Sequence, residues 1–389
     1  MSVQEHFTAS SLDYFPLRLA LFYSVLLIVM GIQVPFLPLW CKAKGLDAEA
    51  IGVVLAVPIG VRLFAVPVIN RVADRWGELR AALVVCSFMS ILGFVAVGFS
   101  VSFATIVLTI AIAALFFTPI GGLVDAYALK GLESRKQSYG RVRLWGSVAF
   151  LVANVCAGFL LSVFAAEYLI WLIVAALAAM SATSIILLPV KTVRAESAAD
   201  YSIRRYLWRS PRFLIVAAAA SCIQSSHAIY YVFSAVIWTT KGFGSVTVGT
   251  LWATGVAAEI ILFAVSGRFA LRPATWIALG AAGAFLRWAA MSLDPPAPLL
   301  LVLQCLHAFS FGATHLGSVQ FASQSAYPGQ VATAQGDFGT VIALAAVIST
   351  GCSGVLYNSL GEQAYLVMAV LAVVAALLLV LGVRLPHRL

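Results

Sequence analysis

The chain has 389 residues, of which 62% are hydrophobic and only 10% charged, and its mean hydropathy is +1.01. These proportions exclude an ordinary soluble domain, in which about a quarter of the residues are charged. The formal net charge is +9, so basic residues exceed acidic ones. Apolar runs of the roughly 20 residues needed to cross a bilayer recur along the chain, and we expect an integral membrane protein.

Twelve apolar runs are predicted to form membrane-spanning helices. Their expected limits are residues 14–38, 49–69, 81–99, 101–124, 144–164, 167–189, 213–238, 247–267, 274–293, 298–324, 336–358 and 363–383. An even number of spans places both termini on one side. The first run follows Glu5 and Asp13 rather than a basic segment, and no small-residue cleavage site follows it. We therefore expect this helix to be retained as an anchor.

Lysine and arginine are concentrated in alternate loops. Most of the 24 lie on the side of the predicted termini, and the other side has only Lys42, Lys44 and Lys241. This bias predicts cytoplasmic termini in a cell (inner or plasma) membrane. The positive charge is then mainly a topology signal, and a nucleic-acid partner is not expected.

The most polar stretch between the predicted helices divides the chain near its middle. We interpret residues 1–190 as one six-helix bundle, 191–212 as a cytoplasmic linker and 213–389 as a second six-helix bundle. The linker arginines could lie on the anionic inner leaflet, although the positive-inside bias alone also explains them. They are Arg204, Arg205, Arg209 and Arg212.

Motifs for energy supply and catalysis are missing from the sequence. It contains no GxxxxGK[ST] loop, no Ser/His/Asp or HExxH arrangement, and six cysteines without metal-ligand spacing. We expect no cofactor, no metal and no enzyme activity. An ion gradient should supply the energy.

Several ionisable residues lie within the predicted spans, where a charge costs several kcal/mol unless it is paired or faces water. They are Arg62, Asp125, Glu259, Arg287, His307 and His315. Such residues indicate a functional site, and in a chain of this composition they favour transport across the membrane.

The loop from Asn70 to Gly77 resembles the G-x-x-x-D-R-x-G loop of the major facilitator superfamily. Asn70 replaces the first glycine, and Glu78 stands where a basic residue is usual. Asp74 and Arg75 are candidates for a conformational gate, because Asp74 can accept a hydrogen bond from a helix N-terminus or an arginine. Gly77 should permit the tight turn into the next helix.

A second resemblance covers nearly the whole chain and is closer to the lactose permease and phenylpropionate permease branches of that superfamily. The residues that carry it are Tyr139–Gly146, His227, Tyr230, Tyr231, Ser234, Glu259, Leu286–Trp288, Gln304 and His307. The resemblance implies the major facilitator fold, which is an all-α membrane fold, and a cation-symport carrier for a small organic solute. We expect the carrier to be a monomer.

Asp125 and Arg143 should be neighbours, because only a short loop separates the ends of their two helices. A paired acid and arginine cost less to bury than either alone. The resemblance implies that both bind substrate. A structural or gating ion pair at the cytoplasmic rim is the alternative.

Glu259 and Arg287 lie too deep in their predicted helices to reach the membrane surface. A carboxylate whose partner comes and goes can take up and release a proton during a transport cycle. Glu259 is therefore the leading proton carrier, with Arg287 as its modulator. A permanent structural salt bridge between them is the alternative.

His307 and His315 are eight residues apart, which places them on one helix face about 12 Å apart along the axis. The resemblance supports a role for His307 in binding and proton coupling. The relatives have a protonating glutamate where this chain has Ser310. The proton site has then moved, to Glu259 or Asp125, or coupling is weak or absent.

A polar and aromatic stripe occupies the span 213–238, at helical spacings of three and four. Its members are Gln224, His227, Tyr231, Ser234 and Trp238. An aromatic acid could stack on Tyr231 or Trp238 and hydrogen-bond to Gln224 or His227. Hydrogen bonding between helices, without substrate contact, is the alternative.

Arg62, in the middle of the second span, suits a carboxylate solute, although it could instead neutralise an acid of its own half. Together these residues predict a proton symporter that imports an aromatic or other monocarboxylate by alternating access. The alternatives are a sugar or nucleoside symporter, a drug or metabolite exporter, and a receptor or scaffold that does not transport.

Overall fold

The computed structural model describes residues 14–133, 135–190, 208, 210–326 and 331–385, without the side chains of residues 74, 76 and 332. Helices and turns make up this part of the chain. The helices before residue 191 are α1 (Phe15–Ala43), α2 (Ala48–Trp76), α3 (Leu79–Gly98), α4 (Phe103–Phe117), α5 (Ile120–Glu133), α6 (Tyr139–Val163), η1 (Ala166–Tyr168) and α7 (Leu169–Ile185). Those after residue 209 are α9 (Pro211–Ser225), α10 (Ala228–Thr240), α11 (Ser245–Ser266), α12 (Pro273–Met291), α13 (Ala297–Cys305), η2 (Ala308–Ala313), α14 (Thr314–Gln324), α15 (Val331–Leu360), η3 (Gly361–Gln363) and α16 (Ala364–Arg384).

The described residues contain 11 candidate membrane spans by length and composition, which confirms an all-helical membrane protein. The segment Thr333–Arg384 is one of them, but with 52 residues it includes both α15 and α16, separated by η3. The predicted span 101–124 was too short. After a break at Thr118–Pro119, α5 continues to Glu133, past the apolar run that hydropathy detects.

Two more of the long spans are interrupted midway. Between α9 and α10, the Ser226 hydroxyl donates to the carbonyl of Ile223 at 2.6 Å, and the His227 ring contacts the same carbonyl at 3.1 Å. Side chains that bind backbone carbonyls in this way loosen the helix ladder and bend the helix. Between α13 and α14 the chain forms the π-helix η2. The π-helix is rare in proteins overall, but where it occurs it is often at a functional site.

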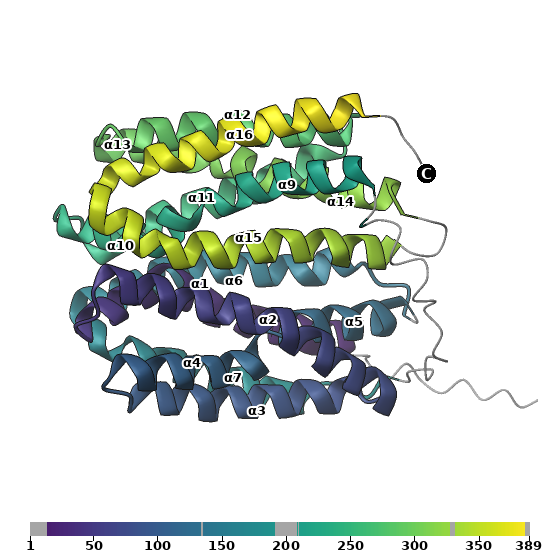
Figure 1. The fold of residues 1–389 in the computed structure, drawn as a ribbon. Helices are drawn as coiled ribbons and strands as arrows, with labels where there is room; N and C mark the ends of the chain where they lie inside the picture. Colours follow the sequence, from purple (N-terminus) through teal and green to yellow (C-terminus); the bar gives the residue numbers. More distant parts are fainter. Residues whose placement is uncertain (1–13, 134, 191–207, 209, 327–330, 386–389) are drawn as a thin grey trace, which may run out of the picture.

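The helices run back and forth between two ends of the molecule (Figure 1). We call the end where α1 begins and α16 finishes the terminal end, and the opposite one the far end. Helices α1–α7 pack mainly on one another, as do α9–α16, and we refer to these sets as the N-terminal and C-terminal halves. The main contacts between the halves pair α2 with α15, α6 with α11 and α1 with α10.

The close contacts between the halves lie toward the far end. A Cβ on Gly354 of α15 would lie 2.2 Å from the carbonyl oxygen of Ala48, at the start of α2. A Cβ on Gly249 of α11 would lie 2.2 Å from the carbonyl oxygen of Asn154 in α6. Only glycine fits at such distances, and small residues of this kind let membrane helices approach closely. At the terminal end, α5 and α14 pack mainly on helices of their own halves.

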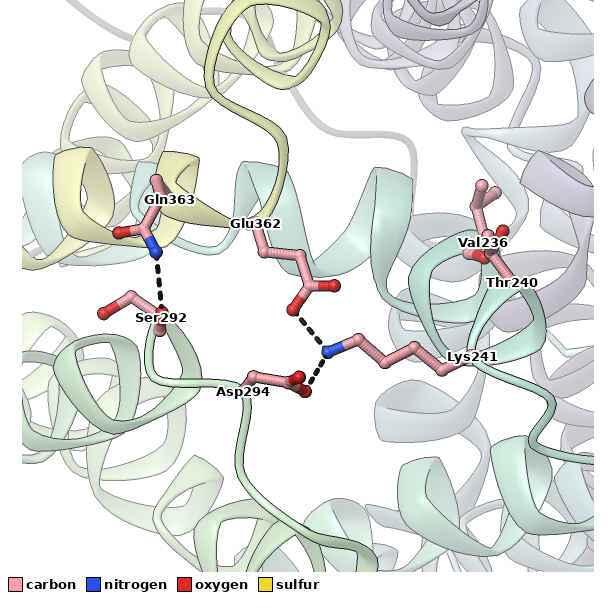
Figure 2. Close-up of polar contacts among 7 residues, drawn as sticks. All are labelled: Val236, Thr240, Lys241, Ser292, Asp294, Glu362 and Gln363. Carbon is pink, nitrogen blue, oxygen red and sulfur yellow. Dashed lines mark hydrogen bonds and ion pairs between the residues drawn. The ribbon is translucent and has the colours of Figure 1, made fainter.

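A cluster of charges ties the far-end loops of the C-terminal half (Figure 2). The Lys241 ammonium, just after α10, contacts the carboxylates of Asp294 and Glu362. Burial alone would lower the pKa of Lys241, but its hydrogen bonds to the two carboxylates outweigh burial and raise that pKa. Beside the cluster, Lys42 of α1 donates to the Thr240 hydroxyl at 3.1 Å and so links the halves.

Candidate functional site

In the N-terminal half, the Asp125 carboxylate is held by two phenols. The hydroxyls of Tyr23 in α1 and Tyr139 in α6 donate to Oδ1 of Asp125 at 2.6 and 2.9 Å. The Arg143 guanidinium lies 5.4 Å from the centre of the Tyr23 ring. The structure therefore brings Asp125 and Arg143 to one tyrosine, as neighbours. It gives them no ion pair with each other within the described residues.

Gly146, one turn after Arg143, makes room for that guanidinium. A Cβ on Gly146 would lie 3.2 Å from Nη1 of Arg143 and 3.2 Å from the carbonyl oxygen of Tyr23. The Arg143 side chain therefore lies close along α6. Within the described residues no carboxylate is within ion-pair distance of it.

In the C-terminal half, Arg287 of α12 is fully buried. Its Nη2 donates to Oε1 of Gln304 at 2.6 Å, and its Nη1 lies 3.0 Å from Nδ1 of His307. The guanidinium stacks 4.3 Å from the centre of the Tyr230 ring and 4.6 Å from that of Trp288. The buried cation is thus held by neutral acceptors and aromatic faces rather than by an acid.

Close helix packing brings these groups together. A Cβ on Gly283 of α12 would lie 2.6 Å from Cβ of Phe309, and a Cβ on Gly255 of α11 would lie 3.3 Å from Cβ of His307. Helices α11 and α12 can therefore both approach the π-helical segment η2. The His307 side chain, at the start of that segment, then reaches Arg287 on one side and Glu259 on the other.

Hydrogen-bond roles fix the state of His307. Arginine has donors and no acceptor, so Nδ1 of His307 must accept from Arg287 and carry no proton. The neutral ring then carries its hydrogen on Nε2, which faces Oε2 of Glu259 at 3.6 Å. A proton added to Nδ1 would set two donors against each other. His307 therefore directs its N–H toward Glu259 and not toward Arg287.

The same reasoning applies to His227, at the break between α9 and α10. Its Nδ1 lies 3.1 Å from the carbonyl of Ile223, so Nδ1 carries the hydrogen. Its Nε2 can then accept from the Ser310 hydroxyl, 3.1 Å away. Arg287 contacts Ser310 as well, at 3.5 Å. Ser310 thus joins His227 to the Arg287 network.

Glu259 also experiences a charge from the other half. Arg143 lies on the facing turn of α6, and it makes no ion pair with Glu259 within the described residues. The register of α6 on α11 accounts for this: Gly158 lies against Ser245 and Asn154 against Gly249, so four residues on one helix match four on the other. Extended toward the terminal end, this antiparallel register brings the Arg143 turn opposite the Glu259 turn.

An aromatic group lies beside this charged cluster. The Tyr230 and Tyr231 rings lie 4.6 and 5.8 Å from the Trp252 ring of α11, and His227 stacks on Tyr231 at 5.5 Å. Tyr231 is partly exposed. Trp238, by contrast, is buried against Tyr230, 6.1 Å between ring centres.

The other predicted residues lie outside this cluster. Arg62 is exposed on α2 and makes no hydrogen bond or ion pair with a described residue. Gln224 is half-buried, and its side chain likewise has no hydrogen-bond partner there. His315 lies on the face predicted from spacing, with Phe311 stacked between it and His307.

The predicted gate is only partly described. The side chain of Asp74 lies outside the described residues, and Arg75 is exposed at the end of α2. Gly77 has φ of +70°, the left-handed conformation that ends α2, as its position predicted.

Sequence reasoning did not identify Tyr23, Trp252 or Asp337. Tyr23 and Trp252 sit within apolar spans, and a lone buried tyrosine or tryptophan, whose O–H or N–H needs a partner, was the available signal. Asp337 is buried near the start of α15, inside the span predicted for that region. A carboxylate within a span was a signal of the same kind as Glu259.

An all-helical membrane protein with ionisable groups of both halves gathered between its helices belongs to the class of polytopic membrane carriers. The model of the MFS_1 like family matches residues 16–367. The chain is 32% identical over 368 residues to a probable 3-phenylpropionic acid transporter of Escherichia coli (strain K12), covering 92% of this chain and 96% of that one. It is 26% identical to the maltose permease of Geobacillus stearothermophilus over 316 residues, 79% of this chain and 78% of that one.

Solved structures share the fold. The nucleoside transporter NupG superimposes with a TM-score of 0.83 at 16% identity, covering 96% of this chain and 100% of that one. A D-xylose-proton symporter superimposes with a TM-score of 0.74 at 11% identity, covering 94% and 97%. The chain belongs to the MFS_1 like family. It is therefore a secondary transporter of the major facilitator superfamily and not an enzyme, as the sequence predicted.

Proposed function

We propose that this carrier is a proton-coupled symporter that imports an aromatic or other small monocarboxylate by alternating access. In this proposal twelve spans form two six-helix bundles, residues 1–190 and 213–389, with both termini cytoplasmic. The linker 191–212 joins them, and its residues 191–207 and 209 lie outside the described residues. The two bundles rock about the charged cluster, which lies between them.

The observation that carries the proposal is the position of Glu259, on the turn of α11 that the helix register places opposite the Arg143 turn of α6, with its carboxylate 3.6 Å from His307. Arg143 has no ion-pair partner among the described residues. A substrate carboxylate and the Glu259 carboxylate therefore compete for the Arg143 charge. When Glu259 takes up a proton, that competition ends and Arg143 binds the substrate anion more tightly, which couples the proton to the solute.

Glu259 is the proton carrier in this scheme because the histidines are fixed as neutral tautomers. A second proton on His307 would break its hydrogen bond from Arg287, because arginine cannot accept. A second proton on His227 would reverse its hydrogen bond with the Ser310 hydroxyl, which can also accept. Both would also place a new charge close to the buried Arg287 cation. Glu259 thereby takes over the role that the glutamate at the Ser310 position has in the relatives it resembles.

The aromatic group and the relatives support an aromatic acid as substrate. Tyr231 is partly exposed beside Trp252, in the half that holds Glu259, so a ring bound there would stay within reach of the cluster. The relative at 32% identity is described as a probable 3-phenylpropionic acid transporter. The maltose permease favours a sugar as the second candidate.

The conformation fits one state of such a cycle. The halves contact each other closely at the far end, through Gly354 and Ala48 and through Gly249 and Asn154. With cytoplasmic termini, the far end is the outer side, and this conformation is closed to the outside. Asp74 and Arg75, at the terminal end of α2, would then stabilise the opposite state, closed to the cytoplasm.

The test is uptake of radiolabelled 3-phenylpropionate into proteoliposomes under an imposed inward proton gradient. Wild-type protein should accumulate the acid. Glu259→Gln should exchange it across the membrane but fail to accumulate it. Arg143→Gln should bind it about tenfold more weakly, the loss of roughly one charge-assisted hydrogen bond.

Arg141→Gln is the matched control, because Arg141 is an exposed arginine two residues before Arg143 on the same helix. It should leave uptake unchanged. Accumulation that ignores the proton gradient, or that survives Glu259→Gln, would contradict the symport mechanism. Maltose or a nucleoside taken up in place of the acid would replace the proposed substrate class.

A further inference from the structure

A pocket with two arginines in its wall lies away from the charged cluster, at the terminal end of the C-terminal half. It has a volume of about 460 Å³ and is enclosed by the ends of α9, α12, α14 and α16. Pockets of roughly 300–1,000 Å³ are the usual size for small-molecule sites. Its polar side chains are Arg212, Arg272, Gln324 and Ser325, and none of the described residues that line it is acidic.

The two arginines lack partners in the described part of the chain. Nε of Arg212 is buried and makes no hydrogen bond. Neither Arg212 nor Arg272 forms an ion pair or a side-chain hydrogen bond with a described residue. A buried donor without an acceptor is unfavourable, so an anion that fills this pocket would remove that penalty.

The backbone adds to the same charge. Helix α12 begins at Pro273, inside the pocket, and its N-cap residue Arg272 makes no side-chain capping bond. The N-terminus of this 19-residue helix therefore points a partial positive charge toward the pocket. Two guanidiniums beside a helix N-terminus suit a phosphate, whose oxygens accept several hydrogen bonds at once.

The surroundings favour a lipid as the source of that phosphate. The remaining wall is apolar and includes Val216 of α9, Phe321 of α14 and Val383 of α16. Helices α12 and α16 lie at the edge of the molecule farthest from the N-terminal half (Figure 1), where a membrane protein meets lipid. A headgroup in the pocket could thus leave its acyl chains along the outside of the bundle.

We propose that this pocket binds the phosphate of an anionic membrane lipid through Arg212, Arg272 and the N-terminus of α12. The site is separate from the transport cluster and does not rest on the proposed substrate. It contacts α9 and α12, the helices that lead to His227 and to Arg287. A bound lipid would hold the terminal ends of four helices of the C-terminal half together.

The experiment uses the full chain in detergent, with lipid binding counted by native mass spectrometry and thermal unfolding measured in parallel. Phosphatidylglycerol should bind and raise the unfolding temperature, and phosphatidylcholine should do so far less. Arg212→Gln and Arg272→Gln should each weaken phosphatidylglycerol binding roughly tenfold, and Arg212→Lys should weaken it less. Arg268→Gln removes the same charge from an exposed residue outside the pocket and should bind as wild type does.

Two further outcomes are decisive. Equal stabilisation by inorganic phosphate at the same concentration would keep the phosphate site and assign its source to the aqueous phase. Phosphatidylglycerol binding that is equal in wild type and in both glutamine variants, or that Arg268→Gln weakens as much, would overturn the proposal. Uptake by the glutamine variants separates this result from the proposed function, because the lipid site can fail while proton-driven uptake persists.

Discussion

The two halves satisfy their central charges in different ways. Asp125 and Arg143, in the N-terminal half, are partly exposed, and Tyr23 and Tyr139 hold only the acid. Arg287, in the C-terminal half, is fully buried and held by neutral acceptors. A buried cation is fixed in charge and place, because moving it would leave unpaired donors in a low-dielectric interior. The exposed arginine can exchange partners, and the buried one cannot.

This difference suggests a division of labour. The C-terminal half fixes the tautomer of His307 and so prepares the surroundings of Glu259. In the proposed mechanism, Arg143 of the N-terminal half, which has no ion-pair partner among the described residues, binds the substrate carboxylate. A carrier needs both. A substrate that bound the two conformations of the carrier with equal affinity could not shift the equilibrium between them.

The largest expected effect comes from Arg287→Lys. A lysine keeps the charge but cannot reach Gln304 and His307 together in one plane. We expect a loss of about 3 kcal/mol in the free energy of unfolding and the loss of proton-driven uptake. Thermal unfolding and uptake of the purified variant measure the two effects.

Arg143→Lys is the matched comparison in the other half. Because no hydrogen-bond network fixes Arg143, we expect its stability to stay within about 0.5 kcal/mol of wild type. Substrate binding should weaken about tenfold. Equal destabilisation by the two lysine variants would remove the contrast between the halves.

A second comparison concerns the two acids. Asp125→Asn keeps an oxygen acceptor for Tyr23 and Tyr139, so the site should stay assembled and uptake should still depend on the proton gradient. Glu259→Gln should leave uptake independent of that gradient. The pH profile of uptake distinguishes them. A flat profile for Asp125→Asn and a normal one for Glu259→Gln would exchange the roles of the two acids.

Much of the fold could be predicted from the sequence, and so could most charged residues of the candidate site. A charge within an apolar run is costly and is therefore easy to recognise. Partners were harder to predict. Asp125 and Arg143 were expected to be neighbours through a short loop, but Tyr23, which contacts both, is distant in sequence. Pairing of distant helices depends on packing that a single sequence does not encode locally.

The helix breaks could not be predicted for a similar reason. Hydropathy treats 213–238 and 298–324 as uniform runs, whereas the structure breaks the first at Ser226 and His227 and includes η2 in the second. These breaks depend on contacts between helices. The Trp288 indole donates to the Ser226 hydroxyl at 2.8 Å, for example. Trp238, a member of the predicted stripe, is buried and packs against Tyr230. Its contact with substrate stays a prediction.

A smaller effect is expected from Tyr23→Phe. It removes one of the two hydroxyls that donate to Asp125. We expect the free energy of substrate binding to weaken by about 1 kcal/mol, which is roughly a fivefold lower affinity. Tyr365→Phe is the control, because the Tyr365 hydroxyl is buried without a hydrogen-bond partner in the described residues. That variant should be as stable as wild type or more so. An affinity loss shared by both variants would mean that the Tyr23 hydrogen bond to Asp125 is not what sets the substrate affinity.

The smallest effect should come from the far-end charges, which extend the comparison from buried to exposed groups. Lys241→Met removes the contacts to Asp294 and Glu362 (Figure 2). Asp294 is 74% exposed on its side chain, so water screens the pair, and we expect a loss of at most about 1 kcal/mol. Lys130→Met, which removes an exposed charge at the terminal end, should change stability less.

The pH dependence gives this last prediction a sign. Folding raises the pKa of Lys241, so its protonated form is the one stabilised. The stabilisation is complete below the ordinary lysine pKa of about 10.4 and is lost as pH rises through the higher value of the folded state. Wild type and Lys241→Met should therefore differ in unfolding temperature at pH 7 and converge above that range. A difference in unfolding temperature that persists above this pH range, or that is as large as the effect of Arg287→Lys, would contradict the prediction. It would mean that solvent exposure does not determine how much these charges contribute to stability.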